Sequence, residues 1–503
     1  MKKGFIILIA AVLSVFTANA QLKKVAEFKL DAMPPLAITN DGNYYLQAGT
    51  KCFEAIDVSG NKVKLNKTYK EAGAAFEKAF DASFDDSGQM LIVCDDETTV
   101  SCIDLTNGKQ LWENKSFTAL GSEKSASSLD CADNVVIVTD KKAKDNYTLT
   151  CLDLKTGKQT WTVENLPSKI NANDIEISAG MVCTSIYQKK EDKSYIKFYN
   201  LNTGKVDVSA VLEGSSIASL ELEDEHMFIH HRVSEKKSFL TAFDLVNKKQ
   251  MWTSPAANLS PNLPMVMNTD VIRYYAAIKS FGDKVLLITE GIEAFDIATG
   301  KAAYNLPFVP YYKWGVGHYI DAIFSPVVTD KGILLADATQ GDIFIKYFDG
   351  ETGKQLWSSE KMKKKNVSPI AYVANGQAVV QFGGTCVFEV VNNSEIGKFL
   401  DPYEVAAFDL KTGKVSWTME FKNAIYTTEM VNGNILVVDK KDMKTIDMKT
   451  GSLLKTEDDP FDDSYFRTKV GLSVTKFQKG AEINFEKRLV FRGKDDKLII
   501  STF

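Results

Sequence analysis

The sequence predicts an all-β fold, a β-propeller of four-stranded antiparallel blades, and three observations lead to this class. A short motif returns along most of the 503-residue chain, at an average spacing of about 49 residues that is typical of propeller repeats. Apolar runs that favour strands, such as Met90-Leu91-Ile92-Val93, precede the copies. Five of the six tryptophans occupy one position of the motif.

The motif consists of an Asp, a Gly four residues later and a Trp four residues after the Gly. Four copies keep all three residues: Asp104, Gly108 and Trp112; Asp153, Gly157 and Trp161; Asp349, Gly353 and Trp357; Asp409, Gly413 and Trp417. Weaker copies centre on Asp57, Asn200, Asp244, Asp296 and Asp447, which makes nine in all.

Each residue type has a mechanical role in this motif. The Asp can accept a hydrogen bond from a backbone N–H two residues on, and the Gly supplies the positive φ of a tight hairpin. The Trp opens the next strand and can pack between neighbouring sheets. Burial of one indole hides about 150–250 Å², or roughly 4–6 kcal/mol at about 25 cal/mol per Å². Packing between blades, more than the turns, should therefore hold the ring together.

The pattern small-aromatic-Asp-x-x-Thr-Gly-Lys-x-x-Trp resembles the blade motif of pyrroloquinoline-quinone-type propellers. Within them, the chain resembles the non-catalytic BamB-type outer-membrane assembly propellers more than the quinoprotein dehydrogenases. The resemblance implies eight blades, whereas nine copies are counted, so we expect eight to ten. Residues 23–30 resemble an outer strand, and residues 489–491 and 498–500 resemble an inner pair of strands. Joining the two ends of the chain in one sheet would close the ring.

The ends and the composition indicate an exported protein. Residues 1–20 have the two lysines, the apolar run and the small residues before a cleavage site of a secretory signal peptide. We expect residues 21–503 to form one propeller domain that is periplasmic or secreted. The residue directly after the expected cleavage site is Gln21 and not a cysteine, so no lipid anchor is expected. No later run is apolar enough to span a membrane. A formal net charge of −5 argues against a nucleic-acid partner, and we expect a monomer.

Nothing in the sequence indicates a catalytic, cofactor or metal site. The resemblance implies that a dehydrogenase would stack its quinone on a disulfide of adjacent cysteines, and no two cysteines are adjacent in this chain. His226, His230 and His231 form the one histidine cluster, but on a strand His231 points away from the other two. Cys102 and Cys151 share a motif position with alanines, so we interpret them as small packed residues.

Long connections predict the binding face. Residues 255–275 and 305–319 are expected between one blade and the next, and residues 141–147, 189–195 and 392–403 between the second and third strands of a blade. These connections share one face of a propeller. The segment 304–319 is dense in aromatic residues and supplies the candidate contacts: Phe308, Tyr311, Tyr312, Trp314, His318 and Tyr319.

Two interpretations of that segment stay open, a partner-binding site or a plug of local core. The leading function is a protein-interaction scaffold of the cell envelope, associated by resemblance with outer-membrane assembly. The alternatives are a quinone-dependent dehydrogenase-like enzyme, and a propeller that binds a glycan or a small ligand.

Overall fold

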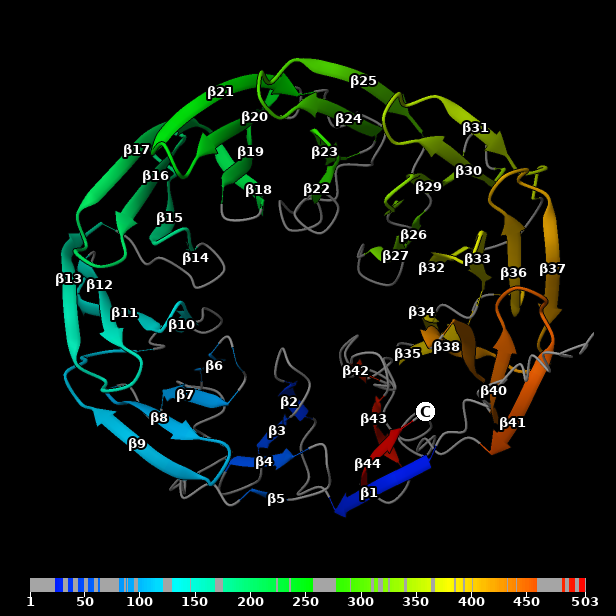
Figure 1. Cartoon of the computed structure of the whole chain (residues 1–503), viewed down its shortest axis with the longest axis horizontal. Coiled ribbons are helices and arrows are strands. Elements are labelled where there is room, and N and C mark those ends of the chain that lie inside the picture. Colours follow the sequence, from blue (N-terminus) through cyan, green and yellow to red (C-terminus); the bar gives the residue numbers. More distant parts are fainter. Residues whose placement is uncertain are drawn as a thin grey trace, which may run out of the picture.

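The protein is a ring of β-sheets in the computed structural model (Figure 1). The structure describes residues 81–458, apart from short gaps and the longer gaps 121–128, 168–174, 257–276 and 315–319, together with strands nearer each end of the chain. The described strands form ten four-stranded sheets and two extra hairpins, and every pair is antiparallel. The predicted propeller class is confirmed, and ten sheets lie within the predicted range of eight to ten.

Each sheet runs from an inner strand to an outer strand. The first five sheets, in that order of strands, are β2 (Pro35–Ile38), β3 (Tyr44–Ala48), β4 (Phe53–Asp57) and β5 (Lys62–Val63); β6 (Asp81–Phe84), β7 (Met90–Cys94), β8 (Val100–Asp104) and β9 (Lys109–Asn114); β10 (Leu129–Ala132), β11 (Val135–Ala143), β12 (Asn146–Asp153) and β13 (Gln159–Leu166); β14 (Ile175–Ser178), β15 (Met181–Gln188), β16 (Lys193–Asn200) and β17 (Val206–Glu213); β18 (Ser215–Leu222), β19 (His226–Ser234), β20 (Lys237–Asp244) and β21 (Lys249–Ala256).

The second five sheets complete the ring. They are β22 (Ala277–Phe281), β23 (Lys284–Ile288), β24 (Gly291–Asp296) and β25 (Ala302–Pro307); β28 (Val327–Val328), β29 (Gly332–Asp337), β30 (Phe344–Asp349) and β31 (Gln355–Ser358); β32 (Val367–Ala374), β33 (Gln377–Phe382), β36 (Glu404–Asp409) and β37 (Val415–Glu420); β38 (Ile425–Val431), β39 (Asn434–Asp439), β40 (Asp442–Asp447) and β41 (Leu453–Asp458); β42 (Glu482–Asn484), β43 (Arg488–Gly493), β44 (Lys497–Thr502) and β1 (Lys23–Lys29).

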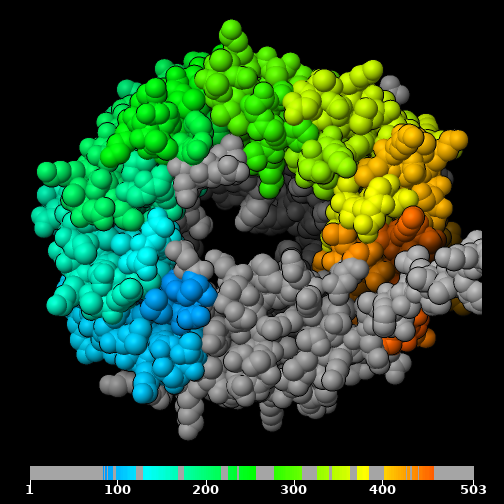
Figure 2. Space-filling model, viewed as in Figure 1, coloured from blue at the N-terminus to red at the C-terminus, as the bar shows by residue number. Residues whose placement is uncertain are grey.

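We call the four strands of each sheet A to D, from the centre of the ring outward. The last sheet contains strands from both ends of the chain, because β1 pairs with β44 and takes the outer position (Figure 1). In the space-filling view the coloured sheets curve around a central opening (Figure 2). The described strands thus form a circle of radial sheets with the A strands toward the centre.

The motif forms the turn between strands C and D, as predicted. In sheet β10–β13, Asp153 Oδ1 accepts hydrogen bonds from both the backbone N–H and the hydroxyl of Thr156, at 2.8 and 2.6 Å. In this copy the bond reaches three residues along the chain, whereas Asp104 Oδ1 accepts from the N–H of Thr106, two residues on, as predicted. Gly157 follows with φ of 65°, and its N–H donates to the Asp153 carbonyl oxygen. The equivalent bond from the Thr412 hydroxyl helps to hold the pKa of Asp409 below its ordinary value.

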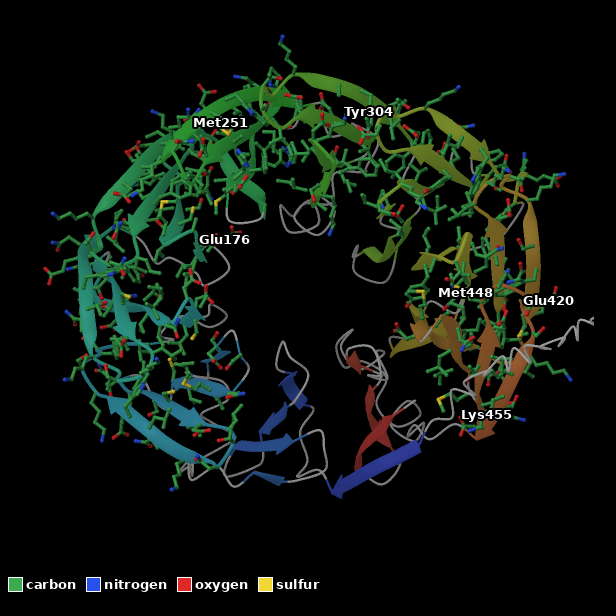
Figure 3. All side chains as sticks on the ribbon, in the orientation of Figure 1. Glu176, Met251, Tyr304, Glu420, Met448 and Lys455 are labelled. Atoms are coloured by element: carbon green, nitrogen blue, oxygen red, sulfur yellow. The ribbon has the colours of Figure 1, made fainter. Side chains whose placement is uncertain are left out.

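The tryptophan of one sheet docks on the motif turn of the next sheet. Trp112 Nε1 donates to the carbonyl oxygen of Leu154, the residue after Asp153, at 2.6 Å, and its ring lies against Gly157. Trp161, Trp252, Trp357 and Trp417 repeat both contacts on the turns that follow them. Tyr304 takes the same place in sheet β22–β25 and donates to the Gly350 carbonyl oxygen (Figure 3). Glycine at this turn position therefore satisfies two needs, a positive φ and room for an aromatic ring.

One junction departs from this rule. Sheet β14–β17 has Val208 where its neighbours have Trp, and the next turn has Lys248, with φ of 55°, where its neighbours have Gly. Because no ring lies on that turn, a side chain fits, and Lys248 Nζ instead pairs with Asp207 Oδ2 at 2.7 Å. Phe198 and Phe243, with ring centroids 5.1 Å apart, fill the junction.

The cysteines beside the motif are packed as predicted. Cys102 and Cys151 are buried without a disulfide, each opposite the Trp of its own D strand. Burial raises the pKa of the Cys102 thiol to about 12 and that of Cys151 to about 11. Both thiols therefore stay protonated and unreactive at neutral pH.

Candidate partner-binding face

The two faces of the ring carry connections of different length. The A-to-B and C-to-D turns lie on one face, which we call the turn face, and the B-to-C and D-to-A connections lie on the other, the loop face. The A-to-B turns are short, as predicted: two residues join β10 to β11, β22 to β23 and β38 to β39. In the first of these turns both residues, Asp133 and Asn134, have positive φ, which matches the twist of a tight hairpin.

The D-to-A connection after β25 contains an extra hairpin of β26 (Tyr312–Trp314) and β27 (Ile320–Ile323). It links sheet β22–β25 to sheet β28–β31, and in Figure 1 it lies on the inner side of the ring. Strand β27 contacts both β32 and β34. The aromatic segment is therefore partly a structured hairpin against the next sheets, and not an open loop.

A second extra hairpin, β34 (Cys386–Val391) and β35 (Ser394–Phe399), lies between β33 and β36. The sequence prediction began this B-to-C insertion at residue 392, whereas the strand pair begins earlier, at Cys386. Of the other two expected B-to-C loops, 141–147 is mostly strand, and 189–195 contains the turn 189–192 followed by the start of β16. Among the described residues, the loop face is thus enlarged by two hairpins that touch each other through β27 and β34.

The structure separates the six candidate contact residues. Phe308 is 7 % exposed and packs with Phe281 and Leu306 in the core between two sheets, so it supports the fold and is not available to a partner. Tyr312 and Trp314 lie on β26, of which the backbone is described. Tyr311, His318 and Tyr319 lie outside the described residues.

A recurring buried aspartate supports the loop face, and sequence reasoning missed it. Asp140, Asp337 and Asp439 stand at equivalent positions near the end of strand B in three sheets, and all are at most 2 % exposed. Asp140 accepts hydrogen bonds from the N–H groups of Thr118 and Ala119 in the preceding D-to-A connection. A signal was available in the sequence, since each of these aspartates follows an apolar run as the sixth residue of strand B.

Asp439 shows how such a carboxylate stays ionised. It accepts from the N–H groups of Lys441 and Asp442, and Lys444 Nζ lies 2.5 Å from Oδ2. Burial opposes ionisation, but these bonds outweigh it and keep the pKa of Asp439 below its ordinary value. The carboxylate therefore fixes the tight turn that joins β39 to β40.

The described residues bring no three histidine, cysteine or acidic side chains into an arrangement that could hold a metal ion. His230 and His231 lie on opposite faces of β19, as strand geometry predicts, and both are buried. No helix in the described part of the chain is long and apolar enough to cross a membrane.

Comparison with known proteins points to one family. Residues 70–181 and 341–476 match the family model described as outer membrane protein assembly factor BamB. No curated protein matches the sequence significantly. Among solved structures, BamB from Moraxella catarrhalis is 11 % identical, with a TM-score of 0.37 over 85 % of this chain and 96 % of that one. A europium-containing methanol dehydrogenase is 12 % identical, with a TM-score of 0.33 over 73 % of this chain and 80 % of that one.

The ring of four-stranded sheets and the tryptophan docking define the class: the chain is a β-propeller, and its repeats resemble those of pyrroloquinoline-quinone-type propellers. Within that class it resembles the BamB-type outer-membrane assembly propellers.

Proposed function

We propose that this protein is a non-catalytic interaction scaffold of the cell envelope that binds a protein partner through the loop face. The match to the BamB family model, over two separate stretches of the chain, supports a role in protein interaction. Residues 1–20 would direct export and be removed, leaving a monomer in the periplasm or outside the cell.

The observation that carries the proposal is the asymmetry of the two faces. Hairpins β26–β27 and β34–β35 come from different sheets, lie on the loop face and touch each other. The turn face keeps short motif turns whose positive-φ glycines leave little room for insertions. Elaborated connections on a rigid scaffold are where binding is usually located.

Tyr312 and Trp314 are the leading contacts of the proposed site, and Tyr311, His318 and Tyr319 remain further candidates from the same segment. Aromatic side chains are enriched among the residues that dominate binding energy, because they bury large areas with little loss of conformational freedom. The backbone of Tyr312 and Trp314 lies on a paired strand, which supports a defined position for this part of the segment.

The test is affinity capture from envelope extract with the mature protein and the double variant Tyr312→Ala, Trp314→Ala. We expect the variant to keep the circular dichroism spectrum and thermal midpoint of the parent and to lose the captured partner. Val246→Ala, an exposed apolar residue of a motif turn on the opposite face, is the matched control and should retain it. A second variant, with residues 386–399 replaced by a short Gly-Ser linker, should also lose the partner.

Two outcomes would contradict the proposal. Loss of folding in the double variant would assign the hairpin to the core, and retained capture would place the site elsewhere. Two further results would favour the alternative functions. Alcohol-dependent dye reduction after addition of quinone and calcium would favour a dehydrogenase, and capture that is abolished by free sugars would favour a glycan ligand.

A further inference from the structure

Two neighbouring buried histidines of β19 differ in their hydrogen bonding. His231 Nδ1 lies 2.7 Å from the Glu213 carbonyl oxygen, and Nε2 lies 2.9 Å from the Thr241 hydroxyl, which in turn contacts Thr253. His230, with no exposed surface, has no hydrogen-bond partner for either ring nitrogen in the described part of the chain. Unpaired buried polar groups are rare and destabilising in folded proteins, so His230 calls for an explanation.

His230 lies in the joint between sheets β18–β21 and β22–β25. It shares a face of β19 with Phe228, which packs with Ile278 and Leu287 of the neighbouring sheet. Its register partners are Ala218 on β18 and Leu240 on β20. The hydroxyl of Ser238, on the same face of β20, is a second buried group without a described partner. One end of the joint therefore contains two adjacent unpaired polar groups in apolar surroundings.

Among the described residues, no acid is hydrogen-bonded to His230. On its own strand, the groups facing the same way are Arg232, a like charge, and His226, beside the motif turn at Asp244. On β20 and β21 the flanking residues are Ser238, Leu240, Ser254 and Ala256. On the neighbouring sheet, Glu293 is the one charged residue among those described that faces the joint, because it pairs in register with Leu287. Its carboxyl makes no hydrogen bond to His230.

We infer that the joint between sheets β18–β21 and β22–β25 is an acid-sensitive seam, in which protonation of His230 favours separation of the two sheets. A positive charge there would be buried without a counter-ion, beside Arg232. Opening would let water reach the imidazolium and the Ser238 hydroxyl. Separation of the two sheets would also move the loop-face ends of β21 and β22 relative to each other.

The size of the effect follows from proton linkage. Burial, followed by the charges of His231 and Arg232, lowers the pKa of His230 to about 4, against 6.5 for a solvated imidazole. A group whose pKa is depressed in the closed state binds protons better when open, so closure is fully stable above 6.5 and weakens as the pH falls toward 4. With these two values the open fraction rises about twentyfold between pH 7 and pH 5.

The test is native-state hydrogen exchange of the mature protein between pH 7 and pH 5, after correction for intrinsic exchange rates. We expect protection of the β22 and β23 amides to fall about twentyfold relative to β39, which lies in a distant sheet. His230→Leu should abolish this difference. His230→Gln, which keeps a polar side chain without a titration in this range, should do the same if the leucine variant folds poorly.

The matched control is His231→Gln, which changes the adjacent, fully bonded histidine and should leave the acid effect on β22 and β23 in place. Equal acid responses in β22 and β39, or an unchanged response in the His230 variants, would overturn the inference. The readout needs no partner, and His230→Leu should capture the envelope partner normally at pH 7. Failure of this inference and failure of the proposed function are therefore distinguishable.

Discussion

The docking of a tryptophan on a glycine predicts a large effect of one added methyl group. In Gly157→Ala, the new Cβ would lie 2.4 Å from Trp112 Cδ2, far inside van der Waals contact, at a backbone φ of 65°. The left-handed backbone costs about 1–2 kcal/mol for a residue with a Cβ. Displacement of the ring adds about 1–3 kcal/mol of overpacking. We therefore expect a loss of about 2–5 kcal/mol.

Two other glycines separate these costs. Gly180 and Gly376 have φ of 69° and 75°, but a Cβ on either would meet nothing within 4 Å. Their alanine variants should lose only the backbone cost, about 1–2 kcal/mol. Urea unfolding, followed by circular dichroism and compared at a common slope, gives the three differences. If Gly157→Ala costs no more than Gly180→Ala, the ring does not constrain the turn and the reasoning fails.

A double-mutant cycle is the stricter form of this test. In the background Trp112→Ala, the ring is absent, so Gly157→Ala should cost only the backbone amount. The coupling energy between the two positions should then equal the overpacking cost, about 1–3 kcal/mol. A coupling near zero would show that the two residues are independent, contrary to the docking geometry.

Further predictions follow from the same contacts. Trp161→Phe should lose about 1 kcal/mol with the hydrogen bond to Leu201, and Trp161→Ala about 3–5 kcal/mol, both measured by urea unfolding. Lys248→Gly should change stability by less than about 1 kcal/mol in the same assay, because relief of a positive φ offsets loss of an exposed ion pair. Asp439→Asn should destabilise by about 1–3 kcal/mol at pH 7. That loss should vanish in acid titrations: the depressed pKa makes the carboxylate stabilising above its unfolded value of about 3.9, and this contribution disappears as the pH falls through the folded value.

The repeat could be predicted from sequence because its roles are local and periodic. The Asp, Gly and Trp of a motif copy lie within nine residues, and each does in the structure what its chemistry favours. The choice of docking partner was less visible, because Trp112 meets Gly157 across a blade boundary. Lys248 shows the same limit: it breaks the pattern for a reason located 40 residues earlier, at Val208.

The loop face was predicted in outline and not in detail. Long insertions indicated where extra structure lies, but the strands of β34 and β35 were missed although Asn392-Asn393 between two strand-favouring runs is a turn signal. Phe308 was assigned to a partner because it lies in an aromatic segment, whereas it fills the core beside Phe281. Whether an aromatic side chain points inward or outward depends on neighbours far along the chain, which composition does not reveal.

The pairing of β1 with β44 has a consequence for synthesis. The first strand to emerge from the ribosome has its partner at the opposite end of the chain, so the circle can be completed only after translation has finished. Until then each newest blade lacks the turn on which its tryptophan docks, and the outer strand at the start stays without its neighbour. Under the export proposed above, the chain would cross the membrane before it becomes a ring, in a state that this topology already requires during synthesis.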